Sequence, residues 1–297
     1  MGNIPVVVLA GSNARFSQTQ KVHGEGTLEG VYKGAEVSFL GRPLILQLIR
    51  VLEESGCFSD VLVAGPRRVY GGLVGSEIID VDGSVGSNIR GVCDFMSGRY
   101  GEQSPFALIY YDVMPKVDEI KAYMDAVGPF LGCGLVIGVV DADLVSFDKR
   151  GYRIIMEGVV RDFCHSNLLV FKPGALDIEL IGDIFDAVYP RRTMGLRGNA
   201  WKMTPALLKR VFRVSFSEGV SGVIKAHSIL RRYERAGVGV SELEGLLTAL
   251  LVKQEYRSKS GVHIEPGPYP SLVEDMDTVE RLKLIEKARS KETVFDN

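Results

Sequence analysis

The sequence predicts an α/β domain with a mostly parallel sheet, helices on both faces of that sheet and a C-terminal helical insertion. Three observations favour this fold. The run Ile4–Ala10 is apolar and rich in β-branched residues, which is typical of a strand buried on both faces. Strand-like and helix-like segments then alternate up to about residue 150. Finally, residues 175–258 have an almost wholly helical periodicity.

The alternating segments can be placed one by one. Pro43 stands at the expected start of a helix, and Gly56 stands at its expected end. Ser87 is the expected cap of a later helix. Because the links between these segments are short, the strands are expected to run parallel. Further strands are expected at residues 60–64, 77–81, 106–111 and 134–140, and a further helix at residues 118–127.

The pattern changes after residue 150. Tyr152–Glu157 and Ser166–Phe171 are strand-like with no helix between them, which predicts an antiparallel pair at one edge of the sheet. The apolar segment Gly261–Ile264 is expected to return to the sheet, and a last helix is expected at residues 278–288. We therefore expect a core formed by residues 1–174 and 259–297, and a helical insertion formed by residues 175–258.

Composition and charge limit the classes of partner. The chain has 35 basic and 37 acidic residues, so a basic face for nucleic acid is not expected. The apolar run at residues 4–10 is too short for a signal peptide or a membrane span. Four cysteines lie far apart and form no metal-binding or redox spacing: Cys57, Cys93, Cys133 and Cys164. A soluble, cytoplasmic protein without a membrane or nucleic-acid partner is expected.

The first candidate motif follows the first strand, at Leu9–Phe16, and reads LAGSNARF. A turn of small residues lets backbone N–H groups approach an anion without a Cβ in the way. Arg15 would add a fork of charged donors for a phosphate. The alternative is an ordinary strand-to-helix turn with a surface arginine.

A lysine ahead of Gly41 is the second candidate. Lys33 stands eight residues before Gly41, and Lys21 lies farther off. A lysine that reaches a triphosphate neutralises charge on the α-phosphate and on the departing pyrophosphate. A solvated loop lysine is the alternative for either residue.

Two acidic segments complete the pattern. Asp112 follows directly after an expected buried strand, and ligands of open α/β sheets bind beyond the carboxyl ends of strands. A carboxylate there suits Mg²⁺, although it could also bond its own turn. Asp277, with Glu280 three residues later, is expected to cap the last helix. Its second carboxylate oxygen would remain for a metal.

The order of these features resembles the MobA-like nucleotidyltransferases, a GT-A-type family that includes molybdenum cofactor guanylyltransferase and many sugar-phosphate nucleotidyltransferases. The sequence departs from the family pattern at Ser12, which replaces a glycine, and in a longer segment before Lys33. The resemblance implies a Rossmann-like sheet of GT-A type. The family pattern is matched at Leu9–Phe16, Lys33, Gly41–Ile45, Asp112 with Pro115, and Asp275–Leu282.

The resemblance also implies roles for individual residues. Arg15 and Lys33, or Lys21 in place of Lys33, would grip the triphosphate of an NTP. Asp112 and Asp277 would hold Mg²⁺ as the cofactor. Residues expected to contact the nucleobase, ribose or phosphates are Leu9, Ala10, Gly11, Ser12, Asn13 and Asn88.

The implied activity is transfer of an NMP from an NTP to a phosphorylated small-molecule acceptor, a sugar phosphate or a cofactor phosphate, with release of pyrophosphate. A GT-A glycosyltransferase that uses a nucleotide sugar through Asp141 and Asp143 is one alternative. A non-catalytic nucleotide-binding homologue is another, because Ser12 alters the loop. The helical insertion would provide an acceptor pocket, a lid or a homo-oligomer interface.

Overall fold

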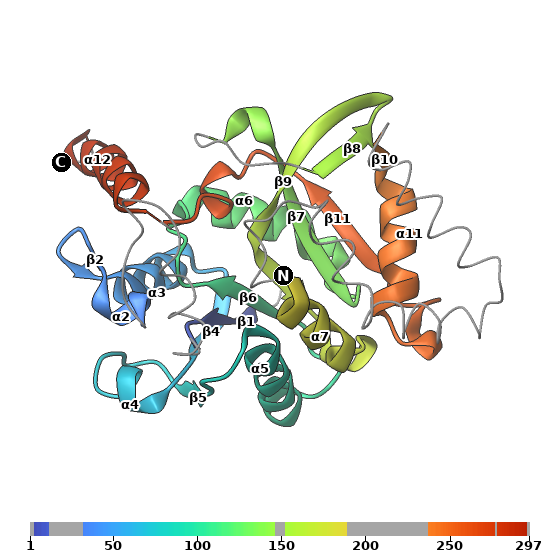
Figure 1. Ribbon diagram of the computed structural model, residues 1–297, viewed down its shortest axis with the longest axis horizontal. Coiled ribbons are helices and arrows are strands. Elements are labelled where there is room, and N and C mark those ends of the chain that lie inside the picture. The colour runs from blue at the N-terminus through green and yellow to red at the C-terminus, as the bar shows by residue number, and fades with distance from the viewer. Residues whose placement is uncertain (1–2, 12–31, 146–151, 189–236, 277, 296–297) are drawn as a thin grey trace.

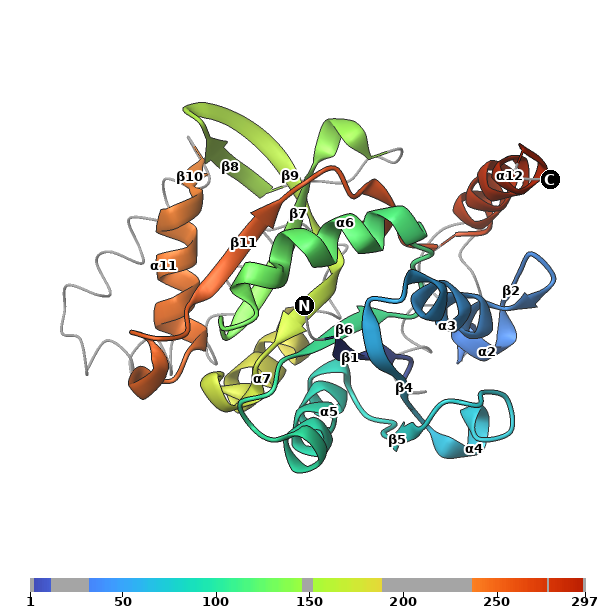
Figure 2. The ribbon, with the colours of Figure 1, turned by 180° about the vertical axis from the view of Figure 1, so that it is seen from behind.

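The computed structural model describes residues 3–11, 32–145, 152–188, 237–276 and 278–295. A central sheet lies between two layers of helices (Figures 1 and 2). Along the sheet the strand order is β10-β8-β9-β6-β1-β4-β5, with β7 beside β9 and β11 beside β7. The strands are β1 (Ile4–Leu9), β4 (Phe58–Gly65), β5 (Ile78–Asp80), β6 (Phe106–Tyr110), β7 (Leu135–Asp141), β8 (Tyr152–Met156), β9 (Val159–Phe171), β10 (Val238–Gly239) and β11 (Val262–Pro266).

The helices cover both faces of this sheet, as the sequence predicts. Helices α3 and α6 pack on one face, and α5, α7 and α11 pack on the other. A small hairpin, β2 (Ser38–Phe39) with β3 (Arg42–Pro43), precedes α3. The helices are α2 (Lys33–Glu36), α3 (Leu44–Ser55), α4 (Arg67–Tyr70), α5 (Val85–Tyr100), α6 (Val117–Val127), α7 (Ile178–Val188), α11 (Val240–Leu251) and α12 (Val279–Phe295).

Alternation along β1 explains why the sheet is buried on both sides. Val6 and Val8 face the α3 and α6 layer, whereas Val7 and Leu9 face the α5 layer. Each of these four side chains is at most 3% exposed. Burial of this kind contributes roughly 25 cal/mol per Å² of apolar surface, and β1 contributes it to the core on both faces of the sheet.

The sheet is mostly parallel, with one antiparallel strand inside it. Strands β5, β4, β1 and β6 run parallel, and β11 runs parallel to β7. Strand β8 pairs antiparallel with residues 159–163 of β9, so the antiparallel arrangement is as expected, whereas the expected partner Ser166–Phe171 and its expected position at the edge are wrong. Residues 168–171 of β9 pair with β6, and residues 163–171 pair with β7. Periodicity shows which side chains of a strand are buried, but it does not show which strands lie beside it. The wrong prediction therefore concerns the strand order.

One predicted helix end is confirmed, and two predicted helix caps are corrected. Gly56 ends α3 in the left-handed region, with φ of 64°, as expected. The cap of α5 is Ser84 rather than Ser87, because the Ser84 hydroxyl accepts from the Ser87 amide. At α12 the hydroxyl of Thr278 accepts from the Arg281 amide, so Thr278 takes the capping place expected for Asp277. Asp277 itself lies outside the described residues.

Both described helices of the predicted insertion pack on the sheet. Helix α7 contributes Leu180 and Ile181 to the core beside α5, and α11 contributes Leu251. The returning segment is confirmed as β11, which pairs with β7 from Val262 to Pro266. Within the described ranges, every helix is too short or too polar to cross a membrane.

Candidate active site

The carboxyl ends of the parallel strands meet at one edge of the sheet, and several predicted residues lie there. Strand β1 ends at Leu9, and its path continues through Ala10, whose amide donates to the Ala64 carbonyl at 2.8 Å. Leu9 and Ala10 are buried, so only their backbone groups could meet a ligand. Ser12, Asn13, Arg15 and Lys21 lie outside the described residues.

Gly11 and Asn88 are brought together at this edge. The Asn88 side chain is 1% exposed and bonds both ways to Gly83: its Oδ1 accepts from the Gly83 amide at 2.7 Å, and its Nδ2 donates to the Gly83 carbonyl at 3.2 Å. A Cβ on Gly11 would lie 2.5 Å from Asn88 Nδ2, closer than atoms can approach. Asn88 therefore bonds the turn after β5 and packs directly against Gly11 in the loop after β1.

A buried tyrosine supports the other side of the loop. The Tyr70 hydroxyl donates to the Ala10 carbonyl at 3.2 Å, and burial raises the pKa of Tyr70 far above its ordinary value. A Cβ on Gly34 would lie 3.2 Å from that hydroxyl and 3.3 Å from the Tyr111 ring. Lys33, the first residue of α2, therefore adjoins a glycine that packs closely against Tyr70 and Tyr111.

Asp112 lies at the end of β6 and is joined to the C-terminal acidic segment. Its carbonyl accepts from the Met276 amide at 2.7 Å, and Val113 forms an isolated antiparallel bridge with Asp275. Asp275 is held in turn by Arg281, at 2.6 Å. The two acidic segments, more than 160 residues apart in the sequence, therefore meet at the carboxyl edge.

The side chains near Asp112 can be compared with the ligands that Mg²⁺ requires. Among the residues that the structure describes, no three His, Cys, Asp or Glu side chains converge to hold a metal. Mg²⁺ at a nucleotide site needs only one or two carboxylates, because triphosphate oxygens and water complete its shell. The Met276 amide bonds the Asp112 carbonyl, so the backbone leading to Asp277 lies beside Asp112, as two carboxylate ligands of one Mg²⁺ would need.

Sequence reasoning did not single out an exposed cluster at the ends of β4 and β5. The Tyr32 hydroxyl donates to Asp82 at 3.0 Å, and Arg68 of α4 bonds both Asp82 and the Tyr32 oxygen. The Arg68 guanidinium also stands over the Tyr32 ring, 5.6 Å from its centroid. These residues lie before α2, in α4 and after β5 and carry no shared motif, so only the fold reveals them.

The acids considered for a glycosyltransferase have structural partners. Asp141 ends β7, and its Oδ1 accepts from the Asp143 amide at 3.1 Å, which caps a single 3-10 turn at Ala142–Leu144. Its Oδ2 pairs with Arg161 at 3.2 Å. These contacts occupy both carboxylate oxygens of Asp141, whereas the backbone of Asp112 is placed by a bond to Met276.

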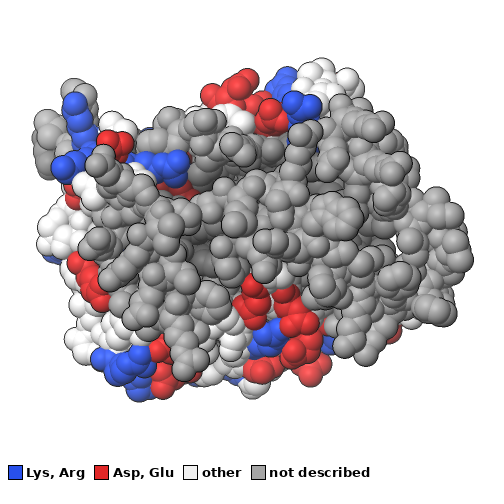
Figure 3. All heavy atoms as spheres, in the orientation of Figure 1, with Lys and Arg blue, Asp and Glu red and all other residues white. Residues whose placement is uncertain are grey.

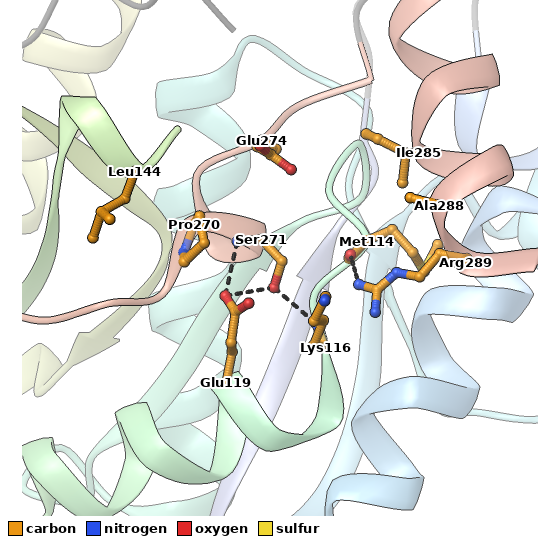
Figure 4. A pocket seen from close by; sticks show the side chains of 10 residues that line it. All are labelled: Met114, Lys116, Glu119, Leu144, Pro270, Ser271, Glu274, Ile285, Ala288 and Arg289. Carbon is orange, nitrogen blue, oxygen red and sulfur yellow. Dashed lines mark hydrogen bonds between the residues drawn. The ribbon is translucent and has the colours of Figure 1, made fainter. Parts of the chain in front are cut away.

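A small pocket lies behind the Asp112 segment (Figure 4), between the start of α6, residues 270–274 and α12. Its polar groups bond mainly to one another. Glu119 accepts from both the amide and the hydroxyl of Ser271 at 2.8 Å, and that hydroxyl accepts from the Lys116 amide. Arg289 donates to the Met114 carbonyl at 2.7 Å. The network holds the chain that leaves Asp112 in a fixed path.

The sequence matches no protein-family model and no curated protein. Two solved structures illustrate which proteins share its fold. A hypothetical transferase from Thermus thermophilus superposes with a TM-score of 0.58 at 18% identity, over 95% of this chain and 100% of the other. The structure of CMP:2-keto-3-deoxy-manno-octonic acid synthetase in complex with CTP superposes with a TM-score of 0.51 at 9% identity, over 98% of this chain and 100% of the other. The likeness covers nearly the whole length of each chain, so the predicted Rossmann-like fold class is confirmed.

Proposed function

We propose that this protein is a nucleotidyltransferase, which transfers an NMP from an NTP to a phosphorylated small-molecule acceptor and releases pyrophosphate. The observation that carries the proposal is the meeting of the Asp112 segment with residues 275–276 at the sheet edge where the loop of Gly11 begins. Motif segments from the two ends of the chain are thus assembled where open α/β sheets bind their ligands.

The proposed reaction is an in-line displacement at the α-phosphorus. An acceptor phosphate oxygen forms a bond to that phosphorus, and the bond to the bridging oxygen breaks. Pyrophosphate leaves with the electron pair of the broken bond, and no covalent intermediate with the protein is needed. Positioning and neutralisation of charge then supply most of the rate.

Each predicted residue has a role in this scheme. The backbone at Leu9–Gly11, with the following Ser12 and Asn13, would cradle the phosphates and base, and Asn88 would hold that loop in place. Arg15 and Lys33 would neutralise the triphosphate. Asp112 and Asp277 would hold Mg²⁺, which when bound supplies further positive charge to the phosphate oxygens.

The nucleotide seen in the CMP:2-keto-3-deoxy-manno-octonic acid synthetase structure makes CTP the first NTP to test. Pyrophosphate release would be measured with each of the four NTPs and Mg²⁺, against a panel of sugar phosphates and a 2-keto sugar acid. Release that depends on both an NTP and an acceptor is expected. Tight NTP binding without release for any acceptor would favour a non-catalytic homologue. Turnover of nucleotide sugars alone would favour the glycosyltransferase.

A further inference from the structure

Helices α5 and α7 make backbone contact beside the candidate nucleotide site. A Cβ on Gly86, in the first turn of α5, would lie 2.0 Å from the Gly182 carbonyl oxygen of α7. No side chain larger than hydrogen fits between the two helices at that point. The two helices lie side by side in both views (Figures 1 and 2). The contact is two residues before Asn88, the residue that bonds Gly83 and packs against Gly11.

Asp186 of α7 bonds the start of α5 directly. The Gly86 amide donates to Asp186 Oδ1 at 2.8 Å. This amide belongs to the first turn of α5, whose N–H groups have no partner within the helix. A carboxylate at this position is favoured both by the hydrogen bond and by the helix dipole. Asp186 thus acts on the same turn that Ser84 caps.

Arg90 fastens α7 to α5 one turn farther on. It pairs with Glu179 at 3.0 Å, with Asp183, and with Asp186 at 3.6 Å. Acidic atoms gather around basic ones over α5 and α7 in Figure 3, at the lower edge of that view. The Arg90 side chain is only 22% exposed, whereas Glu179 and Asp183 are 75% and 55% exposed, so water screens its pairs with those two acids. Only Asp186, however, also reaches the backbone of the first turn.

We propose that Asp186 is a positioning residue for nucleotide binding. Asp186 holds Gly86, the same turn carries Asn88, and Asn88 sets the place of the Gly11 loop through contacts already described. Loss of the Asp186 carboxylate would let the first turn of α5 move and would misplace the loop that cradles the phosphates. This inference rests on the proposed function.

The test compares three variants of the full-length protein. Asp186→Ala removes the acceptor for Gly86. Asp186→Asn keeps an oxygen acceptor and loses the charge. Asp183→Ala is the matched control, because it removes an Arg90 partner and leaves the Gly86 bond intact. The readouts are the Kd of each Mg-NTP by calorimetry, kcat and KM for pyrophosphate release, and Tm.

For Asp186→Ala we expect Kd and KM for the NTP to rise about tenfold, the effect expected if only about a tenth of the free variant keeps the loop in its binding position. The kcat value should stay within about threefold, because Asp186 touches no reacting atom. Asp186→Asn should recover most of the affinity, and Asp183→Ala should leave Kd within about twofold.

Two results would overturn the inference while the proposed function stands. One is an unchanged Kd in Asp186→Ala with a lowered Tm, which would make the residue purely structural. The other is an equal loss of affinity in Asp183→Ala, which would assign the effect to the whole acidic cluster. A wild-type protein that binds no NTP would overturn both the inference and the proposed function.

Discussion

The side-chain amide of Asn88 occupies the space that a Cβ on Gly11 would need, with 2.5 Å between that Cβ and Nδ2. The two residues are 77 positions apart: Gly11 follows β1, and Asn88 lies in the first turns of α5, after β5. Because of this contact, Gly11 cannot be replaced by a residue with a side chain unless Asn88 and the turn after β5 move.

This contact predicts a coupled pair of substitutions. Gly11→Ala should destabilise the protein by about 1–3 kcal/mol through overpacking. Asn88→Ala should cost about 1–3 kcal/mol, because it leaves both Gly83 backbone groups without the Asn88 amide. The double variant should lose less than the sum, since truncating Asn88 makes room for the new methyl group. Urea unfolding of the four proteins measures this, and strict additivity would show that the two sites do not interact.

A second prediction compares Asp112 with Asp143, the acid of the alternative glycosyltransferase site. Asp112→Asn should lower kcat for pyrophosphate release by about 100-fold or more, because charge at the phosphates would be less well neutralised. Asp143→Asn is the matched control and should leave kcat within about twofold, since the proposed reaction does not use it.

The reverse pattern, with activity lost only in Asp143→Asn, would contradict the proposed function. Tm for both variants shows whether either substitution unfolds the protein. The backbone bond from Met276 to the Asp112 carbonyl does not depend on the Asp112 side chain, so the loop should keep its path in Asp112→Asn.

A third prediction distinguishes the two candidate lysines. Lys33 precedes Gly34, which packs closely against Tyr70 and Tyr111. Lys33→Met should therefore raise KM for the NTP and lower kcat, together about 100-fold in kcat/KM. Lys21→Met, a substitution of the same size, should change kcat/KM by less than about threefold. Steady-state kinetics of the two variants would reverse the assignment if only Lys21→Met lost activity.

A fourth prediction concerns pH. Burial raises the pKa of Glu119, although Ser271 donates two hydrogen bonds to its carboxylate. A raised pKa in the folded state means that the contribution of Glu119 to stability is present below the ordinary glutamate pKa and is lost as the pH rises through the raised value. The free energy of unfolding of the wild type should therefore fall relative to Glu119→Gln between about pH 4 and pH 7. Urea unfolding across this range should show the difference; a constant offset would contradict it.

The sequence predicts the parts of this molecule that depend on local pattern. Apolar runs locate β1, β4 and β6, and Gly56 marks the end of α3, because burial and the left-handed conformation leave a local signal. Motif order also predicts that the Asp112 and Asp275 segments belong to one site. The position of β9 between β6 and β7 could not be predicted, since strand neighbours depend on tertiary pairing.

The same limit applies to individual contacts in the candidate site. Nothing in the sequence indicates that Tyr70 would reach the Ala10 carbonyl, or that Asp186 would bond Gly86. These contacts join residues 60 and 100 positions apart and leave no periodic trace. The choice of Ser84 over Ser87 as a cap is a smaller error of the same origin, because both are good capping residues and the fold decides where the helix starts.

The pairing of β11 with β7 has a consequence for how the chain is made on the ribosome. Val262 of β11 is synthesised about 120 residues after β7 ends. At about 5–20 residues per second, the outer edge of β7 waits roughly 6–24 s for its partner. Strand β9 covers the other edge of β7 much sooner. During that interval a nascent chain exposes an apolar strand edge, the kind of surface that chaperones bind and that promotes aggregation when translation stalls.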